Sequence, residues 1–585
     1  MAIAGFASVV GALLVAHYNP ATGYELSLYR ATPVGFWIGI AVAFASALSL
    51  AFLADDGLYR RLGVAIGGLA SLSVVALPTI RGYYFLGIHD ALTHLGLARG
   101  LAEGSILPGD LFYPGLHTLA AFVHGMTGLS IWHSMLLVPL CFVLIFFAFT
   151  TLSVCEIAGG DAAMVAGAFS AFLLVPVHLI ANTLTAHPSS QTILFAPIIV
   201  FLLVRFLRTP EDRSLGVFTS MGVALLLVVF GSILYHPQQA LNVVILLVVL
   251  TGYRYVAARY STYHWVSTRQ VALVASVSVI AYLGWVLQSP AVVDVASGAV
   301  DSVTAQLAGG TVGREESVTT QTSALQAIGS SLLVVFLKLF FVSTTYIVLT
   351  GLVLLGSLRN SFRASDVRDD TVSVTRYLGL ALVVMFPVFL FYLVGNVASH
   401  YFREAGFMLM LGTAVGAVGI AYATKRIERA RYSAVGRMAL VGGLAVLLIL
   451  SMGVVYNSPY MNKATQHITE ARVDGYHATF ETANSSAEMA GIRQEPRRYY
   501  EAMIGSEFEN PRDGSVNSSE IRRLAQLRAE DWYLTMHSNT YQREIRAYEE
   551  YRFTEIDLRS VQRQENVGLV YSNGDMELYY VTPDS

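Results

Sequence analysis

The sequence contains about thirteen apolar runs that are each long enough to cross roughly 30 Å of hydrocarbon. Only 13% of its 585 residues are charged, against about 25% in ordinary soluble domains. We therefore expect an all-α polytopic membrane protein. The runs cover residues 2–17, 33–54, 62–80, 134–154, 161–181, 190–207, 215–234, 239–257, 270–288, 329–355, 374–396, 403–423 and 437–456.

Arginine is distributed unevenly between the loops that join these runs. Short loops rich in Arg and Lys stay in the cytoplasm, and an odd number of spans places the two chain ends on opposite sides. One set of loops carries Arg60, Arg61, Arg205, Arg208, Arg213, Arg254, Arg259, Arg269, Arg359, Arg363, Arg368, Arg376, Lys425, Arg426, Arg429, Arg431 and Arg437, and the other carries Arg30, Arg81, Arg99, Arg314 and Arg403. This asymmetry predicts a cytoplasmic N-terminus and an extracellular C-terminus.

The chain is expected to divide into a membrane part, residues 1–456, and a small extracytoplasmic α+β domain, residues 457–585. In the second part, Asn573-Gly574 stands between two β-prone segments and predicts a hairpin. The spacing of apolar residues from Asn517 to Trp532 predicts a capped amphipathic helix.

Composition excludes some classes of function. The 37 basic and 40 acidic residues give a net charge of −3, so a nucleic-acid partner is not expected. There is no phosphate-binding loop of the GxxxxGK[ST] type, which argues against nucleotide hydrolysis. Cys141 and Cys155 are the only cysteines, so a disulfide framework is not available.

Titratable residues gather at the ends of the spans that the arginine pattern places outside. His89, Asp90, His94 and His117 fall in one long outer segment, and further histidines and charges follow in later outer loops. Such groups are costly at a bilayer surface unless they face protein or a wet cavity, so they predict a site. The later residues are His187, His236, His400, Arg403 and Glu404.

The densest group lies between Gly87 and His117. Asp90 and His94 are four residues apart, which places them on one face of a helix. Pro114 suits the first turn of a further helix that would carry His117. Asp90 could act as a general base, and the alternative is that it only caps the helix that carries His94.

Other outer residues are expected to bind substrate. His187-Pro188 and His236-Pro237 each open a span, and simple helix-start chemistry is an equally good reading of both. The guanidinium of Arg403 matches a phosphate, with Glu404 or the anionic lipid surface as its alternative partner. The outer loop 289–330, which includes Arg314-Glu315-Glu316, has no assigned role.

A divalent metal is conceivable here, because Asp90 with His89, His94 or His117 could ligate one. No ligand spacing indicates such a site, so we expect neither a metal nor any other cofactor to be required.

The run from His89 to His117 resembles the GT-C superfamily of membrane glycosyltransferases, which use polyprenyl- or dolichyl-phosphate sugars. These enzymes place an acidic residue at the start of a large outer loop, in an Asp-x-x-x-His-like context, and commonly have a Tyr-Pro-x-x-His segment. Asp90, His94, Tyr113, Pro114 and His117 match this arrangement. The loop follows the third apolar run rather than the first, and His89 replaces a second acidic residue. The Trp-Trp-Asp signature of oligosaccharyltransferases is absent.

The resemblance implies transfer of a single sugar from a lipid phosphate to a glycan or glycoprotein acceptor, with inversion, on the outer face of the bilayer. Asp90 would deprotonate the acceptor. Arg403, with His187 or His236, would stabilise the departing phosphate, and His89, His94, Tyr113, His117 and Glu404 would line the site. Two alternatives remain: a non-catalytic flippase or exporter of lipid-linked glycans, and a polysaccharide polymerase or ligase.

Overall fold

The computed structural model describes residues 1–177, 181–209, 214–215, 217–257, 266–307, 331–361, 368, 370–395, 400–484, 486–493, 496–505 and 514–584. Within the described residues, helices occupy most of each apolar run. Eleven helical segments there are long and apolar enough to span a membrane, with Pro188–Leu207 counted as one, and two shorter apolar helices cover Ala2–His17 and Ser220–Tyr235. The chain is thus a multi-pass membrane protein. The Arg314-Glu315-Glu316 group of the sequence analysis lies outside the described residues.

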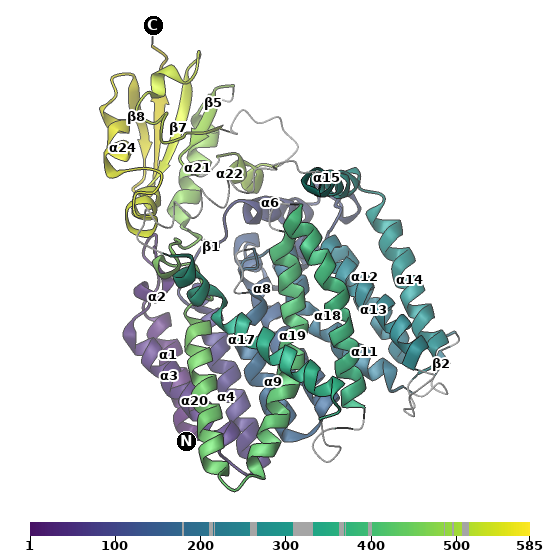
Figure 1. Ribbon diagram of the computed structural model, residues 1–585. Coiled ribbons are helices and arrows are strands. Elements are labelled where there is room, and N and C mark those ends of the chain that lie inside the picture. Colours follow the sequence, from purple (N-terminus) through teal and green to yellow (C-terminus); the bar gives the residue numbers. More distant parts are fainter. Residues whose placement is uncertain are drawn as a thin grey trace.

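The apolar helices form one bundle with the N-terminus at one end and the C-terminal sheet at the other (Figure 1). They are α1 (Ala2–His17), α3 (Val34–Phe52), α4 (Gly57–Val75), α8 (Ile131–Ala158), α9 (Gly160–Phe172), α10 (Pro188–Phe195), α11 (Pro197–Leu207), α12 (Ser220–Tyr235), α13 (Pro237–Ala257), α14 (Thr268–Val286), α17 (Leu332–Leu358), α18 (Thr371–Val394), α19 (His400–Glu428) and α20 (Ser433–Met452).

Shorter elements cover the end of the bundle that faces the C-terminal sheet (Figure 1). The amphipathic α15 (Pro290–Leu307) lies there, within the loop that the sequence left unassigned. The other short elements are α2 (Leu28–Ala31), α5 (Leu77–Ile80), β1 (Phe85–Leu86), α6 (Asp90–Glu103) and α7 (Gly115–Thr127). The segment from His89 to His117 therefore sits on top of the bundle.

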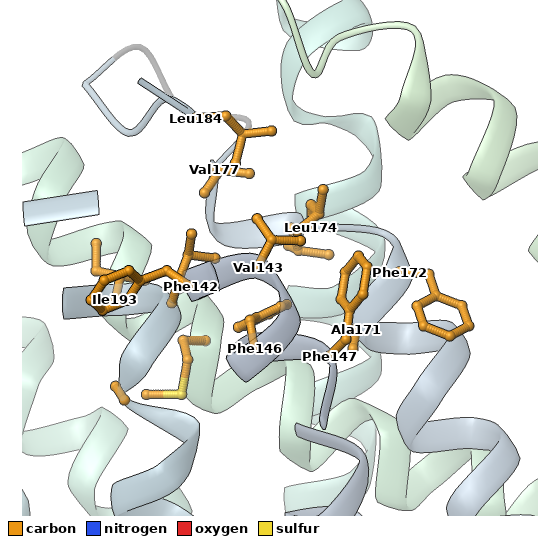
Figure 2. Packing of buried hydrophobic residues seen from close by; sticks show 14 of the residues in the cluster. Phe142, Val143, Phe146, Phe147, Ala171, Phe172, Leu174, Val177, Leu184 and Ile193 are labelled. Atoms are coloured by element: carbon orange, nitrogen blue, oxygen red, sulfur yellow. The ribbon is translucent and has the colours of Figure 1, made fainter. Parts of the chain in front are cut away.

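In the core α8 packs against α9, and Figure 2 shows part of the apolar cluster to which both helices contribute. Phe142 and Phe146 of α8 are buried together with Phe172 at the end of α9. Leu184 and Ile193 belong to the same apolar cluster and continue it up to the start of α10. Large buried aromatic side chains contribute much of the stabilisation that apolar packing gives. This close packing holds the N-terminal end of α10, which carries site residues, in a defined position.

The C-terminal part forms a five-stranded mixed sheet in the order β6-β5-β7-β9-β8. Strand β5 pairs in parallel with β6 and β7, whereas β9 pairs antiparallel with β7 and β8. The elements after α20 are β4 (His467–Ile468), α21 (Glu470–Thr482), β5 (Glu488–Gly491), α22 (Pro496–Met503), β6 (Gly514–Ser515), β7 (Trp532–His537), α23 (Ser538–Gln542), α24 (Glu555–Ser560), β8 (Val567–Ser572) and β9 (Met576–Val581).

The predicted hairpin is confirmed, since β8 and β9 flank Asn573-Gly574. Gly574 has φ +90°, a conformation that favours glycine. The side-chain oxygen of Asn573 accepts a hydrogen bond from the backbone N–H of Met576 at 2.9 Å. The turn is closed by local chemistry that the sequence already displays.

The predicted amphipathic helix from Asn517 to Trp532 is wrong. The segment consists of turns and a short 3-10 helix, Leu524–Gln526, and Trp532 begins strand β7. Ile521, Leu524 and Trp532 are all buried in the core of the C-terminal sheet. These residues are spaced as they are because an irregular segment buries them against the sheet. Over so few residues, this spacing cannot be distinguished from the periodicity of an amphipathic helix.

The C-terminal part is attached directly to the segment that precedes Asp90. Strand β1 pairs antiparallel with β4, and the ring of His467 stacks on Tyr83 at a centroid distance of 3.7 Å. Helix α22 packs on α6 a few residues further along the chain. The structure thus holds the start of α6 between the helical bundle and the C-terminal sheet.

Candidate active site

Asp90 is the first residue of α6 and follows a tight backbone turn. Gly87 has φ +144°, and a Cβ there would lie 2.6 Å from the Cβ of Ala91. His89 has φ +55°, which non-glycine residues rarely adopt and which concentrates at functional sites. The turn leaves the Asp90 side chain 58% exposed at the surface of the bundle. No side-chain hydrogen bond caps α6, so the capping alternative has no support among the described contacts.

Beside Asp90, four histidines and Tyr113 form a compact cluster. His94 Nδ1 lies 3.0 Å from His117 Nε2, and the His94 ring meets His187 edge-on at 5.8 Å between centroids. Tyr113 lies between His94, at 6.1 Å, and His236, at 6.0 Å. Four separate segments of the chain supply these side chains.

Burial keeps these histidines neutral. It lowers the pKa of His117 and of His187 to about 4, and it lowers the pKa of His94 and of His236 well below the ordinary value. Burial also raises the pKa of Tyr113, and the charge of Asp90 adds to this effect. The cluster therefore offers uncharged donors and acceptors, which suit sugar hydroxyl groups better than a phosphate.

Arg403 lies in the first turn of α19, and its charge acts on the same cluster. Its positive charge adds to the lowering of the pKa of His187 and of His236, whereas the charge of Asp90 acts on His187 in the opposite direction. Among the described residues the Arg403 guanidinium has no hydrogen-bond or ion-pair partner, and its Nε is buried. Burial desolvates the Arg403 guanidinium, and the charge of Asp90 opposes this effect by favouring its charged form. A desolvated guanidinium at a membrane surface is suited to an anionic ligand.

Further buried polar atoms without a described partner surround this place, namely His187 Nδ1, His236 Nδ1 and Gln191 Nε2. Buried polar groups are nearly always satisfied, so a concentration of unsatisfied ones marks a surface that binds a polar ligand. The sequence analysis missed Gln191, whose Oε1 accepts a hydrogen bond from the Tyr235 hydroxyl at 3.0 Å. Only its position three residues after Pro188 could have indicated it.

Two predicted site residues lie apart from the ring cluster. Glu404 is fully buried, and its Oε2 accepts a hydrogen bond from Asn242 Nδ2 at 2.9 Å, which joins α19 to α13, while its Oε1 has no described partner. It is therefore not the partner of Arg403 either. His89 is exposed at the turn before Asp90 and lies outside the ring cluster.

Metal binding has little basis in the side chains themselves. No group of three His, Cys, Asp or Glu residues within the described parts of the chain is arranged to hold an ion. Arg498 of α22 also lies 3.3 Å from Asp90, and a cation is a poor neighbour for a metal ligand. The described neighbour of Asp90 is therefore the guanidinium of Arg498.

Comparison with solved structures finds proteins of similar fold. The crystal structure of the Archaeoglobus fulgidus oligosaccharyltransferase in complex with Zn and sulfate is similar, with a TM-score of 0.52 at 11% sequence identity, over 88% of this chain and 72% of that chain. The apo form gives a TM-score of 0.51 at 11% identity, over 90% and 75%. No family model and no curated protein matches the sequence. The likeness concerns the fold alone.

The neutral histidines make stability depend on pH. His117 has a folded-state pKa of about 4, below its ordinary value of 6.5, so the unfolded chain takes up its proton first as the pH falls. We expect the unfolding temperature in detergent to decrease between about pH 6.5 and 4, and His117→Gln to reduce this dependence. The control variant is His477→Gln, which makes the same change at an exposed histidine. An unchanged pH dependence in His117→Gln would contradict the assignment.

Proposed function

We propose that this protein transfers a sugar from a polyprenyl- or dolichyl-phosphate donor to a glycan or glycoprotein acceptor at the outer surface of the membrane, with inversion of the anomeric centre. The observation that carries the proposal is that Asp90 and Arg403 both act on one neutral His and Tyr cluster. Asp90 offers a base and Arg403 a cation, which is what displacement of a phosphate by a hydroxyl requires.

In this reaction Asp90 takes the proton of the acceptor hydroxyl while the oxygen attacks the anomeric carbon. The new C–O bond forms as the bond between that carbon and the phosphate oxygen breaks. The electron pair of the broken bond leaves with the lipid phosphate, whose negative charge Arg403 balances. His187 and His236 donate or accept neutral hydrogen bonds, and the energy of the donor bond drives the reaction without a nucleotide or another cofactor.

An apolar groove supports a lipid-linked donor. It has a volume of about 570 Å³ and lies between α17, α18 and α19. Its lining includes Phe340, Phe386 and Phe402, and Phe402 directly precedes Arg403 in the chain. An isoprenoid chain in this groove would bring its phosphate to Arg403, whereas a water-soluble sugar nucleotide would have no use for it.

The outer location rests on the arginine distribution, which places the site and the C-terminal sheet together outside the cell. The similar fold is that of an oligosaccharyltransferase, a class that acts on glycans. The absence of a Trp-Trp-Asp segment favours transfer of one sugar over transfer of a whole glycan. The mass of the product distinguishes transfer of one sugar from transfer of a whole glycan, and it also distinguishes both from the action of a polymerase or ligase.

The test uses membranes that contain the full chain, radiolabelled dolichyl-phosphate hexose and a glycan or glycopeptide acceptor. We expect label to move from the lipid fraction to the acceptor and to increase its mass by one sugar. Membranes from the same host without the protein are the control. If no donor in a panel of polyprenyl-phosphate sugars loses label, and labelled lipid instead changes leaflet, the flippase reading replaces this one.

A further inference from the structure

The C-terminal part contacts the candidate active site through α22. This helix packs on α6 at Gly96, where an added Cβ would collide with the backbone of Glu501 and come within 3.2 Å of the Cα of Ala502. Backbones that approach so closely leave no room for any side chain at Gly96. Thus the position of α22 relative to α6 is defined by direct backbone contact.

From this position Arg498 of α22 reaches the start of α6. Its NH2 nitrogen lies 3.3 Å from Asp90 Oδ1, and its NH1 donates a hydrogen bond to Thr93 Oγ1 at 2.7 Å. Thr93 in turn donates to Glu501 Oε2 at 2.5 Å. Asp90 and Thr93 are three residues apart and share one face of α6, so one guanidinium contacts both.

The ion pair between Asp90 and Arg498 is too exposed to contribute much to folding. The side chain of Asp90 is 58% exposed and that of Arg498 is 22% exposed, and ion pairs in such surroundings stabilise proteins only slightly. Its effect is instead geometric, because a short carboxylate at a helix start has a freely rotating end unless a neighbour holds it. A general base works only when it stays within hydrogen-bond reach of the proton it removes.

We propose that Arg498 is a positioning residue for the transfer reaction, and that the active site is complete only when the C-terminal α22 is docked on α6. Arg498 holds the Asp90 carboxylate in the orientation that receives the acceptor proton. This inference rests on the proposed role of Asp90 as the base.

The first experiment compares Arg498→Gln, Arg498→Lys and a matched control in the label-transfer assay. Arg498→Gln is expected to lower kcat by about 10-fold to 100-fold with little change in the KM for the donor, because misplacement of a reacting group costs about this much. Arg498→Lys retains the charge and is expected to recover most of the activity. Arg559→Gln, which removes an exposed arginine of the same C-terminal part, is expected to leave the rate unchanged.

A double-mutant cycle separates positioning from folding. If Arg498 acts through Asp90, Arg498→Gln has no further effect in an Asp90→Asn background, whereas a general loss of structure would add to it. Gly96→Val provides a second route, since it displaces α22 without changing Asp90 or Arg498, and it is expected to match the loss of kcat in Arg498→Gln.

The outcomes distinguish the two proposals. Loss of transfer in Asp90→Asn with full activity in Arg498→Gln and Gly96→Val would overturn the role of Arg498 and leave the proposed function intact. Additive losses in the double mutant would also overturn it. Full activity in Asp90→Asn would remove the proposed function itself, and the role of Arg498 with it.

Discussion

Replacement of Asp90 by asparagine is expected to lower the rate of sugar transfer by about 10²-fold to 10⁴-fold, the usual contribution of a general base. Asparagine preserves the size of the side chain but cannot accept the proton of the acceptor hydroxyl. Because Asp90 lies at an exposed helix start and caps no backbone N–H in the described contacts, its loss leaves the fold intact. The initial rate of label transfer to acceptor measures the effect.

The control for this variant is donor binding. Asp90 is not among the residues that line the lipid groove, so Asp90→Asn should bind polyprenyl phosphate as the unchanged protein does. Native mass spectrometry with polyprenyl phosphate measures this directly. A variant that binds lipid and transfers sugar at the full rate would rule out Asp90 as the base and favour a non-catalytic lipid carrier.

Replacement of Arg403 by glutamine is expected to lower kcat/KM by about 10²-fold to 10³-fold, as the loss of a group that stabilises developing negative charge does. The neighbouring histidines cannot replace it. Burial keeps them neutral at pH 7, with pKa values of about 4 for His117 and His187. Arg403→Lys keeps the charge but loses the two-pronged contact with phosphate, so we expect intermediate activity.

For Arg403 the decisive readout is the affinity for the lipid phosphate without its sugar. Arg403→Gln is expected to weaken binding of polyprenyl phosphate, which Asp90→Asn does not. Arg30→Gln, which removes an exposed arginine near the same end of the bundle, is the matched control. Equal affinity in Arg403→Gln and Arg30→Gln would show that the phosphate binds elsewhere.

The helices of the membrane part were predictable because each must be apolar over its full length, whatever its neighbours are. The hairpin at Asn573-Gly574 was predictable for a related reason, since the turn is closed by its own residues. The segment from Asn517 to Trp532 shows the limit. The positions of its buried residues are set by the sheet against which they pack, and most of that sheet comes from other parts of the chain.

The candidate site divides in the same way. The residues of the His and Tyr cluster could be grouped from the sequence, because topology alone places alternate loops between spans at one membrane surface. The sequence could not show that Glu404, next to Arg403, is buried against Asn242. A difference of one residue on a helix turns the side chain by about 100°, and only packing decides which neighbour it meets.

Arg498 stands furthest from what sequence reasoning can reach. It lies in a polar segment more than 400 residues after Asp90, one arginine among many, with no motif around it. By itself the sequence determined that this is a multi-pass membrane protein and where its apolar helices lie, because hydrophobicity is a property of local segments. Only the tertiary structure decided which cation meets Asp90 and which residues are neutral, because these depend on burial and on distances between remote parts of the chain.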